Sequence, residues 1–282
     1  MTKRIGFSLV MGLLTALFVV SCGGDKGGGN ENATAGGGGD SGSKPAYQSA
    51  GDEGTVTGKI VFSGAAPAAK KIDMGQDPVC ANAQGDKNTE DVVVADGKLA
   101  NVFVYVKSGG AVDKYSFSKP SGDVELDQKG CRYHPHVLGV QTGQTIKIVN
   151  SDPTTHNIHP TPAHNAEWNQ SQPAGSAPLE KSFQRAETLI PVKCNQHPWM
   201  KCYVGVLAHP FYSVSSDKDG TYTIKGLPPG DYVIAAWHEK YGEQTAKVTV
   251  TAKGAITQDF TFNGQTAYNK TSLSVQPAMS LP

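Results

Sequence analysis

Apolar residues alternate with polar or small ones along much of the chain, and this alternation restricts the fold more than any other feature. It is clear in residues 56–62 and again in residues 101–107. A period of two places every second side chain on one face of a β-strand. No long segment shows the period of a helix, so we expect an all-β protein.

Turn signals near the C-terminus predict a β-hairpin. The segment Gly226-Leu-Pro-Pro-Gly230 separates two short alternating runs, and such residues favour tight turns. The run from Asp217 to Tyr232 resembles the transthyretin-like sandwich of carboxypeptidase regulatory domains, and residues 54–64 resemble the opening strand and turn of that family. The resemblance implies a binding or stabilising module without catalysis.

The two parts of this sandwich lie far apart in the sequence. We therefore expect a β-sandwich made of residues 55–118 and 209–263, with a second domain, residues 119–208, inserted into it at one loop. Two tandem domains are the alternative arrangement. Residues 264–282 would form a C-terminal tail.

A short loop carries the chemistry of the inserted domain. The segment Cys194-Asn-Gln-His197-Pro-Trp-Met200 combines a thiolate, an imidazole and a thioether, which are ligand types of a blue copper site. His156, upstream of this loop, can supply a second imidazole. It follows a predicted strand at residues 145–149. His159 lies three residues later and is the alternative ligand.

With these motifs, residues 124–208 resemble the cupredoxins of the amicyanin and plastocyanin type. The resemblance implies a Greek-key β-sandwich that holds one type 1 copper ion through His156, Cys194, His197 and Met200. It also implies that Asn157 ties the ligand loops together near the thiolate sulfur.

The same resemblance implies where electrons leave the site. The outer edge of the His197 ring would reach the surface within an apolar patch, to which Pro198 and Trp199 would contribute. The implied function is one-electron transfer between exported redox proteins, with a c-type cytochrome or a dehydrogenase as partner.

The other histidines are expected to have no metal. His134 and His136 form a His-x-His pair, but a copper cluster needs several such pairs, so we expect a strand end there. His164, His209 and His238 have no ligand-like neighbour in the sequence, and we expect them on the surface.

Five cysteines remain to be assigned. Cys22 belongs to the N-terminal anchor and Cys194 to the metal loop, so one disulfide and one free thiol is the simplest division of the rest. We favour a disulfide between Cys80 and Cys131, because both flank predicted strands outside the metal loop, and this leaves Cys202 free. A structural zinc site that uses Cys194, Cys202 and histidines is the competing interpretation.

The N-terminus indicates export. Two basic residues precede an apolar run, residues 5–20, which is typical of a signal peptide (residues 1–21). Residues 19–22 resemble the lipobox of bacterial lipoproteins, which implies a lipid on Cys22. Residues 23–54 read as a flexible linker. The residue after Cys22 is glycine and not the aspartate that signals retention in the inner membrane. We therefore expect the lipoprotein at the outer membrane, facing the periplasm.

Several functional classes are excluded or disfavoured. Lysine and arginine number 25 and aspartate and glutamate 25, with no basic run, so nucleic acid is not an expected partner. No nucleophile elbow, metal-hydrolase helix or cofactor fingerprint is present, so we expect no enzyme. The few methionines argue against copper storage or delivery.

Overall fold

The structure is a computed structural model that describes residues 44–216 and 218–264. Its regular secondary structure is almost entirely strand, which confirms the expected all-β fold. The predicted signal peptide, the lipid site at Cys22 and the tail after residue 264 lie outside the described residues. Within them, no helix is long and apolar enough to span a membrane.

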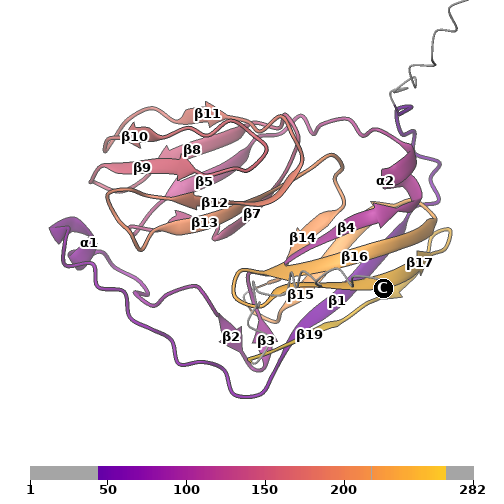
Figure 1. Ribbon diagram of the computed structural model, residues 1–282, viewed down its shortest axis with the longest axis horizontal. Helices are drawn as coiled ribbons and strands as arrows, with labels where there is room; N and C mark the ends of the chain where they lie inside the picture. Colours follow the sequence, from indigo (N-terminus) through magenta and orange to yellow (C-terminus); the bar gives the residue numbers. More distant parts are fainter. Residues whose placement is uncertain (1–43, 217, 265–282) are drawn as a thin grey trace, which may run out of the picture. The chain divides into compact units, whose positions relative to one another are not determined.

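The first sandwich is built from both ends of the described chain (Figure 1). Its N-terminal elements are β1 (Gly54–Ser63), β2 (Val94–Ala95), β3 (Lys98–Leu99), β4 (Phe103–Gly109) and α2 (Gly110–Lys114), and the short helix α1 (Pro78–Asn82) lies in the connection between β1 and β2. Its C-terminal strands are β14 (Tyr212–Val214), β15 (Thr221–Leu227), β16 (Gly230–His238), β17 (Gly242–Val250), β18 (Ala255–Thr257) and β19 (Phe260–Asn263).

Two sheets make up this sandwich. One has the strand order β15-β1-β3-β2, with β18 and β19 also paired to β1, and the other has the order β14-β4-β16-β17. The alternating side chains expected from the sequence pack between the sheets, among them Val56, Phe62, Val104 and Ile234. Burial of such a continuous apolar core is the main term that stabilises a sandwich.

The second sandwich lies between β4 and β14 in the sequence. Its strands are β5 (Val124–Gln128), β6 (Tyr133–His134), β7 (Val137–Gln141), β8 (Ile146–Asn150), β9 (His156–Pro160), β10 (Gln170–Gln172), β11 (Leu179–Lys181), β12 (Glu187–Lys193) and β13 (Lys201–Leu207). They form sheets of order β10-β9-β12-β13-β7 and β11-β8-β5-β6. The chain therefore leaves one sandwich, completes another and returns.

A small apolar cluster joins the two sandwiches. Phe103 and Tyr212, from the first, pack on Gly139 and Gly205, which are paired in register on β7 and β13. A Cβ atom on Gly205 would come within 2.6 Å of the Phe103 ring, and one on Gly139 within 2.3 Å of the Tyr212 ring. Only glycine leaves room for the aromatic rings here.

Two expectations about this region differ from the structure. His209 and His238 are buried, whereas we expected them on the surface; the first stacks on Phe211 and the second on Tyr241. Burial lowers the pKa of each to about 4, so each packs as a neutral aromatic ring. Exposed His164 lies where it was expected.

The predicted linker also ends earlier than residue 54. Tyr47 packs against Tyr115 and Phe117, and its backbone N–H donates to the carbonyl of Ser116 at 2.8 Å. One aromatic side chain within an otherwise polar segment thus docks residues near 47 onto the first sandwich.

Candidate metal centre

Three side chains predicted as ligands converge at one end of the second sandwich. Nδ1 of His156 lies 2.9 Å from Nδ1 of His197, and Sγ of Cys194 lies 3.7 Å from the same atom of His197. All three residues are buried, and their ligand atoms lie within 4.8 Å of one another. Ligands about 2.0 and 2.3 Å from one ion have such nitrogen–sulfur separations, so this donor set fits a thiophilic metal ion.

Local structure brings the ligands together. Cys194 and Met200 flank the loop between β12 and β13, whose ends are paired at Lys193 and Lys201. The loop is closed by hydrogen bonds from Cys194 N–H to the Met200 carbonyl, at 3.2 Å, and from Met200 N–H to the His197 carbonyl, at 2.9 Å. His156 begins β9, which pairs with β12, so it faces the loop from the neighbouring strand.

Each imidazole is held at its outer nitrogen by a carboxylate. Asp152 accepts from Nε2 of His156 at 2.9 Å, and its oxygens also accept from the backbone N–H groups of Gly130 and Cys131, each at 2.7 Å. Asp77 accepts from Nε2 of His197 at 3.1 Å. A carboxylate at Nε2 leaves Nδ1 free for metal and fixes the orientation of the ring.

The sulfur of Cys194 also accepts a hydrogen bond. The backbone N–H of Asn157 points at Sγ of Cys194 at 3.4 Å, while the side-chain oxygen of Asn157 accepts from the N–H of Asn195. Asn157 thus links β9 to the ligand loop beside the sulfur, the arrangement that the cupredoxin resemblance implies.

Without metal, the electrostatics of the site favour an ion pair between the Cys194 thiolate and the His156 imidazolium. Burial alone would raise the pKa of Cys194, but hydrogen bonds from His156 and the Asn157 N–H outweigh it and lower that pKa. Burial opposes the charged form of His156, but Asp152 and Cys194 outweigh it and raise the pKa of His156 to about 9. Burial lowers the pKa of His197. The lowered pKa of Cys194 favours its thiolate and the lowered pKa of His197 favours its neutral imidazole, which are the forms that bind a metal.

Met200 lies in the same buried cluster as Cys194 and is 1% exposed. Its neighbour Trp199 is partly exposed; the indole ring centre lies 5.1 Å from that of His197, and Nε1 donates to the carbonyl of Cys131 at 3.1 Å. The loop therefore presents its thioether to the core and its indole to the His197 ring.

The surface exposure expected for His197 is wrong. The residue is 4% exposed, because the connection between β1 and β2 lies over its outer edge. Asp77 caps the N-terminus of α1, with Pro78 in the first helical turn, and α1 carries Cys80, whose Sγ lies 3.7 Å from Nε2 of His197. We call residues 72–91 the cap segment.

A disulfide joins the cap segment to the second sandwich. It links Cys80 to Cys131, with a Cα–Cα distance of 5.6 Å, and both cysteines are buried. Two further His, Cys and carboxylate groupings around the site include these cysteines, but sulfurs in a disulfide are not thiolate ligands.

The remaining candidates lie elsewhere. Both ring nitrogens of His159 contact other side chains: Nδ1 lies 3.0 Å from Oδ1 of Asn195, and Nε2 lies 2.6 Å from Oε1 of Glu167. Cys202 is a free thiol with no exposed surface, and burial raises its pKa. Among the described residues it joins no group of possible metal ligands, so the zinc site built on Cys194 and Cys202 has no geometric basis.

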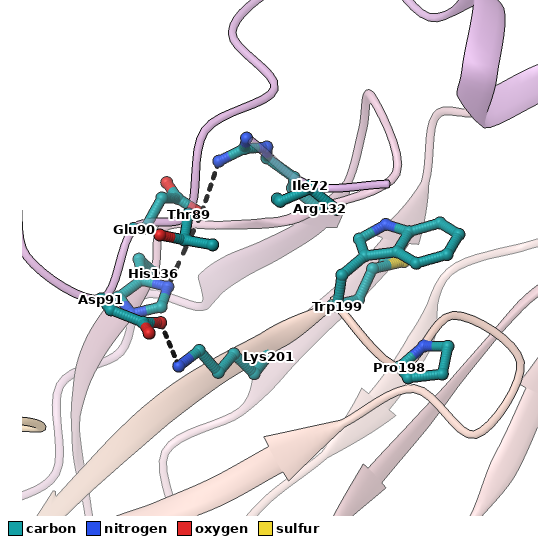
Figure 2. Close-up of a pocket in the computed structure, with 10 residues that line it drawn as sticks. Ile72, Thr89, Glu90, Asp91, Arg132, His136, Pro198, Trp199 and Lys201 are labelled. Carbon is teal, nitrogen blue, oxygen red and sulfur yellow. Dashed lines mark ion pairs between the residues drawn. The ribbon is translucent and has the colours of Figure 1, made fainter. Parts of the chain in front are cut away.

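Ion pairs tie the cap segment to the second sandwich beside the ligand loop (Figure 2). Lys201, next to Met200, pairs with Asp91 and also with Glu239 of the first sandwich, the latter at 2.7 Å. Arg132 pairs with Glu90 at 3.2 Å. His136, the second member of the His-x-His pair, donates to Glu239 at 2.7 Å, whereas His134 is exposed at the end of β6.

Sequence reasoning missed the residues that cover the site. Asp152 lies four residues before His156 and is near enough in sequence to have been considered. Asp77 lies 120 residues from His197, in a segment with almost no regular structure, and no spacing rule connects the two.

Comparisons with known proteins agree with parts of this description. Residues 205–263 match the family model of the carboxypeptidase regulatory-like domain, which confirms the resemblance drawn from the C-terminal hairpin. No curated protein matches the chain.

Solved structures similar to the chain include a novel purple cupredoxin from Nitrosopumilus maritimus, with 22% identity and a TM-score of 0.26; the match covers 30% of this chain and 99% of that one. An oxidised proline-to-glycine mutant of amicyanin matches with 20% identity and a TM-score of 0.27, over 36% and 97% of the two chains. A copper-containing nitrite reductase from Thermus scotoductus SA-01 matches with 16% identity and a TM-score of 0.28, over 54% and 28%.

Proposed function

We propose that this protein is a type 1 copper protein that carries single electrons. The observation that carries the proposal is the convergence of Cys194, His156 and His197 in one buried group with the backbone N–H of Asn157 directed at the sulfur. Soft sulfur and imidazole ligands together suit both copper oxidation states. Met200, buried in the same cluster, would be the fourth and weakest ligand.

Copper bound here would supply one-electron chemistry, and the protein would supply rigidity. Asp152 and Asp77 hold the two imidazoles, and the buried cluster around Cys194 and Met200 keeps water away. Ligands that cannot move keep similar positions in both oxidation states, so little energy is spent on rearrangement when an electron arrives or leaves.

A structural zinc site is the weaker candidate. Structural zinc is enclosed by four cysteine or histidine ligands, whereas the described residues bring together one cysteine and two histidines. A thioether next to this set favours copper over zinc.

We further propose that the protein is exported and lipid-anchored at Cys22, with the folded part facing the periplasm from the outer membrane. The predicted signal peptide and lipobox support this location. The partner would be another exported redox protein, such as a c-type cytochrome or a dehydrogenase, and the chain itself would not be an enzyme.

A visible spectrum of the copper-loaded protein tests the proposal. The wild type should show the intense thiolate-to-copper absorption, and C194S should lose it because a hydroxyl is a poor copper ligand. Cys202→Ser is the matched control, since it removes the second of the two free cysteines among the described residues, which is also buried, and should keep the colour. A colourless wild type that binds zinc stoichiometrically, or a coloured C194S protein, would contradict the proposal.

A further inference from the structure

The ring edge that would ordinarily exchange electrons is closed in this protein. Nε2 of His197 is occupied by Asp77 at 3.1 Å, and Sγ of Cys80 lies 3.7 Å from the same nitrogen. Asp77 is itself held by Thr154, whose hydroxyl donates to it at 2.9 Å. With the disulfide to Cys131 securing this cover, a partner has no direct contact with the His197 ring.

Trp199 is the aromatic side chain that leads from His197 toward solvent. Its ring packs on the His197 ring, with centres 5.1 Å apart, and it is partly exposed, whereas His197 and Met200 are buried. The hydrogen bond from Nε1 to the Cys131 carbonyl fixes the indole against the disulfide-linked part of the chain. Pro198 beside it is exposed.

A pocket of about 250 Å³ opens onto this indole (Figure 2). Ile72 and Thr89 of the cap segment form part of its wall, together with Pro198 of the ligand loop. The charged side chains around it are paired across the wall, Arg132 with Glu90 and Lys201 with Asp91. The approach to the indole is therefore close to neutral in charge.

We propose that electrons enter and leave this protein through the indole of Trp199, which a partner reaches by way of this pocket. This proposal rests on the proposed copper site. In each event one electron would pass between copper held by His156, Cys194 and His197 and the redox centre of the partner, so that one would be oxidised as the other is reduced. Trp199 is neutral before and after, no proton is transferred, and no covalent bond forms or breaks.

The test compares Trp199→Leu with wild type in electron exchange, measured by stopped-flow absorbance with ferricyanide or hexaammineruthenium as the reagent. Removing the indole should slow both reagents by about tenfold, equivalent to about 1.4 kcal/mol in activation free energy. The reduction potential and the visible spectrum should stay the same, because the ligands are untouched. Trp199→Phe, which keeps an aromatic contact with His197, should recover part of the rate.

The matched control is Trp168→Leu. Trp168, like Trp199, packs against the core of the second sandwich, and Nζ of Lys181 lies 5.0 Å from the centre of the Trp168 ring. Loss of this indole should leave the rates unchanged. Since the pocket is neutral, the anionic and cationic reagents should slow equally in W199L; opposite changes would indicate an electrostatic effect and overturn the relay.

A second variant keeps the proposal testable if W199L takes up no copper. Thr89→Leu narrows the pocket from the cap segment with an aliphatic side chain and leaves the ligand loop unaltered, so it should slow both reagents. A coloured W199L protein, or failing that T89L, that exchanges electrons at the wild-type rate refutes the relay alone. A wild type without the visible band refutes the copper site, and the relay with it.

Discussion

Replacing Asp152 with asparagine isolates the support that one carboxylate gives to the site. Asp152 accepts hydrogen bonds from two backbone amides, those of Gly130 and Cys131, and from the ring of His156. Asparagine has nearly the same shape, but it carries no charge and only one accepting oxygen. At least one of the three donors therefore loses its acceptor and faces an amide N–H instead.

The expected size of the effect follows from the raised pKa of His156. Burial opposes the charged ring, yet Asp152 and Cys194 raise the pKa of His156 from 6.5 to about 9. At about 1.4 kcal/mol for each pH unit, the combined effect is about 3 kcal/mol, of which Asp152 supplies a part. A lost hydrogen bond to a charged group costs about 1.5 to 3 kcal/mol. We expect D152N to lower the free energy of unfolding of the copper-free protein by about 2 to 3 kcal/mol at pH 7.

Urea unfolding of the copper-free protein measures this difference. Asp127→Asn is the matched control, because Asp127 lies in the same sandwich and accepts from the exposed hydroxyl of Ser151 at 3.0 Å. Its loss should change stability by less than about 0.5 kcal/mol. Equal midpoints for D152N and D127N would refute the reasoning, since the carboxylate would then contribute nothing that an amide cannot supply.

Two other predictions concern the ligands themselves. Met200→Gln should lower the reduction potential, because an amide oxygen favours Cu(II). The expected shift is about 60 mV, which corresponds for one electron to a tenfold change in relative affinity for the two copper states. An unchanged potential measured by voltammetry in a folded variant would remove Met200 from the site. The second prediction concerns how the stability of the copper-free protein depends on pH. Because the pKa of His156 is raised, its contribution to the free energy of unfolding is complete below pH 6.5 and is lost as the pH rises through about 9. Because the pKa of Cys194 is lowered, its contribution is complete above its ordinary pKa of 9.0 and is lost as the pH falls. These slopes oppose each other between pH 6.5 and 9. The free energy of unfolding from urea titrations should therefore fall less steeply with pH in the wild type than in C194S, where it should fall by up to about 1.4 kcal/mol per pH unit. Parallel profiles would contradict the ion pair.

The ligand loop was predictable because its chemistry is local. Cys194, His197 and Met200 lie within seven residues, so their types and spacing were visible in the sequence. The all-β fold was predictable for a similar reason, since alternation is a property of each strand by itself. The burial of His209 and His238 was not, because a histidine that packs as a neutral ring leaves no periodic signal.

The cap segment escaped prediction because long-range contacts decide its position. Asp77 is the N-cap of a five-residue helix in an otherwise irregular connection, and such a segment takes its conformation from what it packs against. Here it packs on the ligands of the other sandwich, to which it is joined by the Cys80 to Cys131 disulfide and by the Arg132 to Glu90 ion pair.

This arrangement changes what the first sandwich contributes. Its family resemblance implied a module without chemistry, yet its β1–β2 connection supplies the carboxylate at Nε2 of His197, and Glu239 holds Lys201 next to Met200. Residues 119–208 alone would retain every predicted metal ligand but not the cover over His197. The candidate site therefore extends beyond the sandwich that carries the predicted ligands, and the proposed route for electrons depends on both sandwiches.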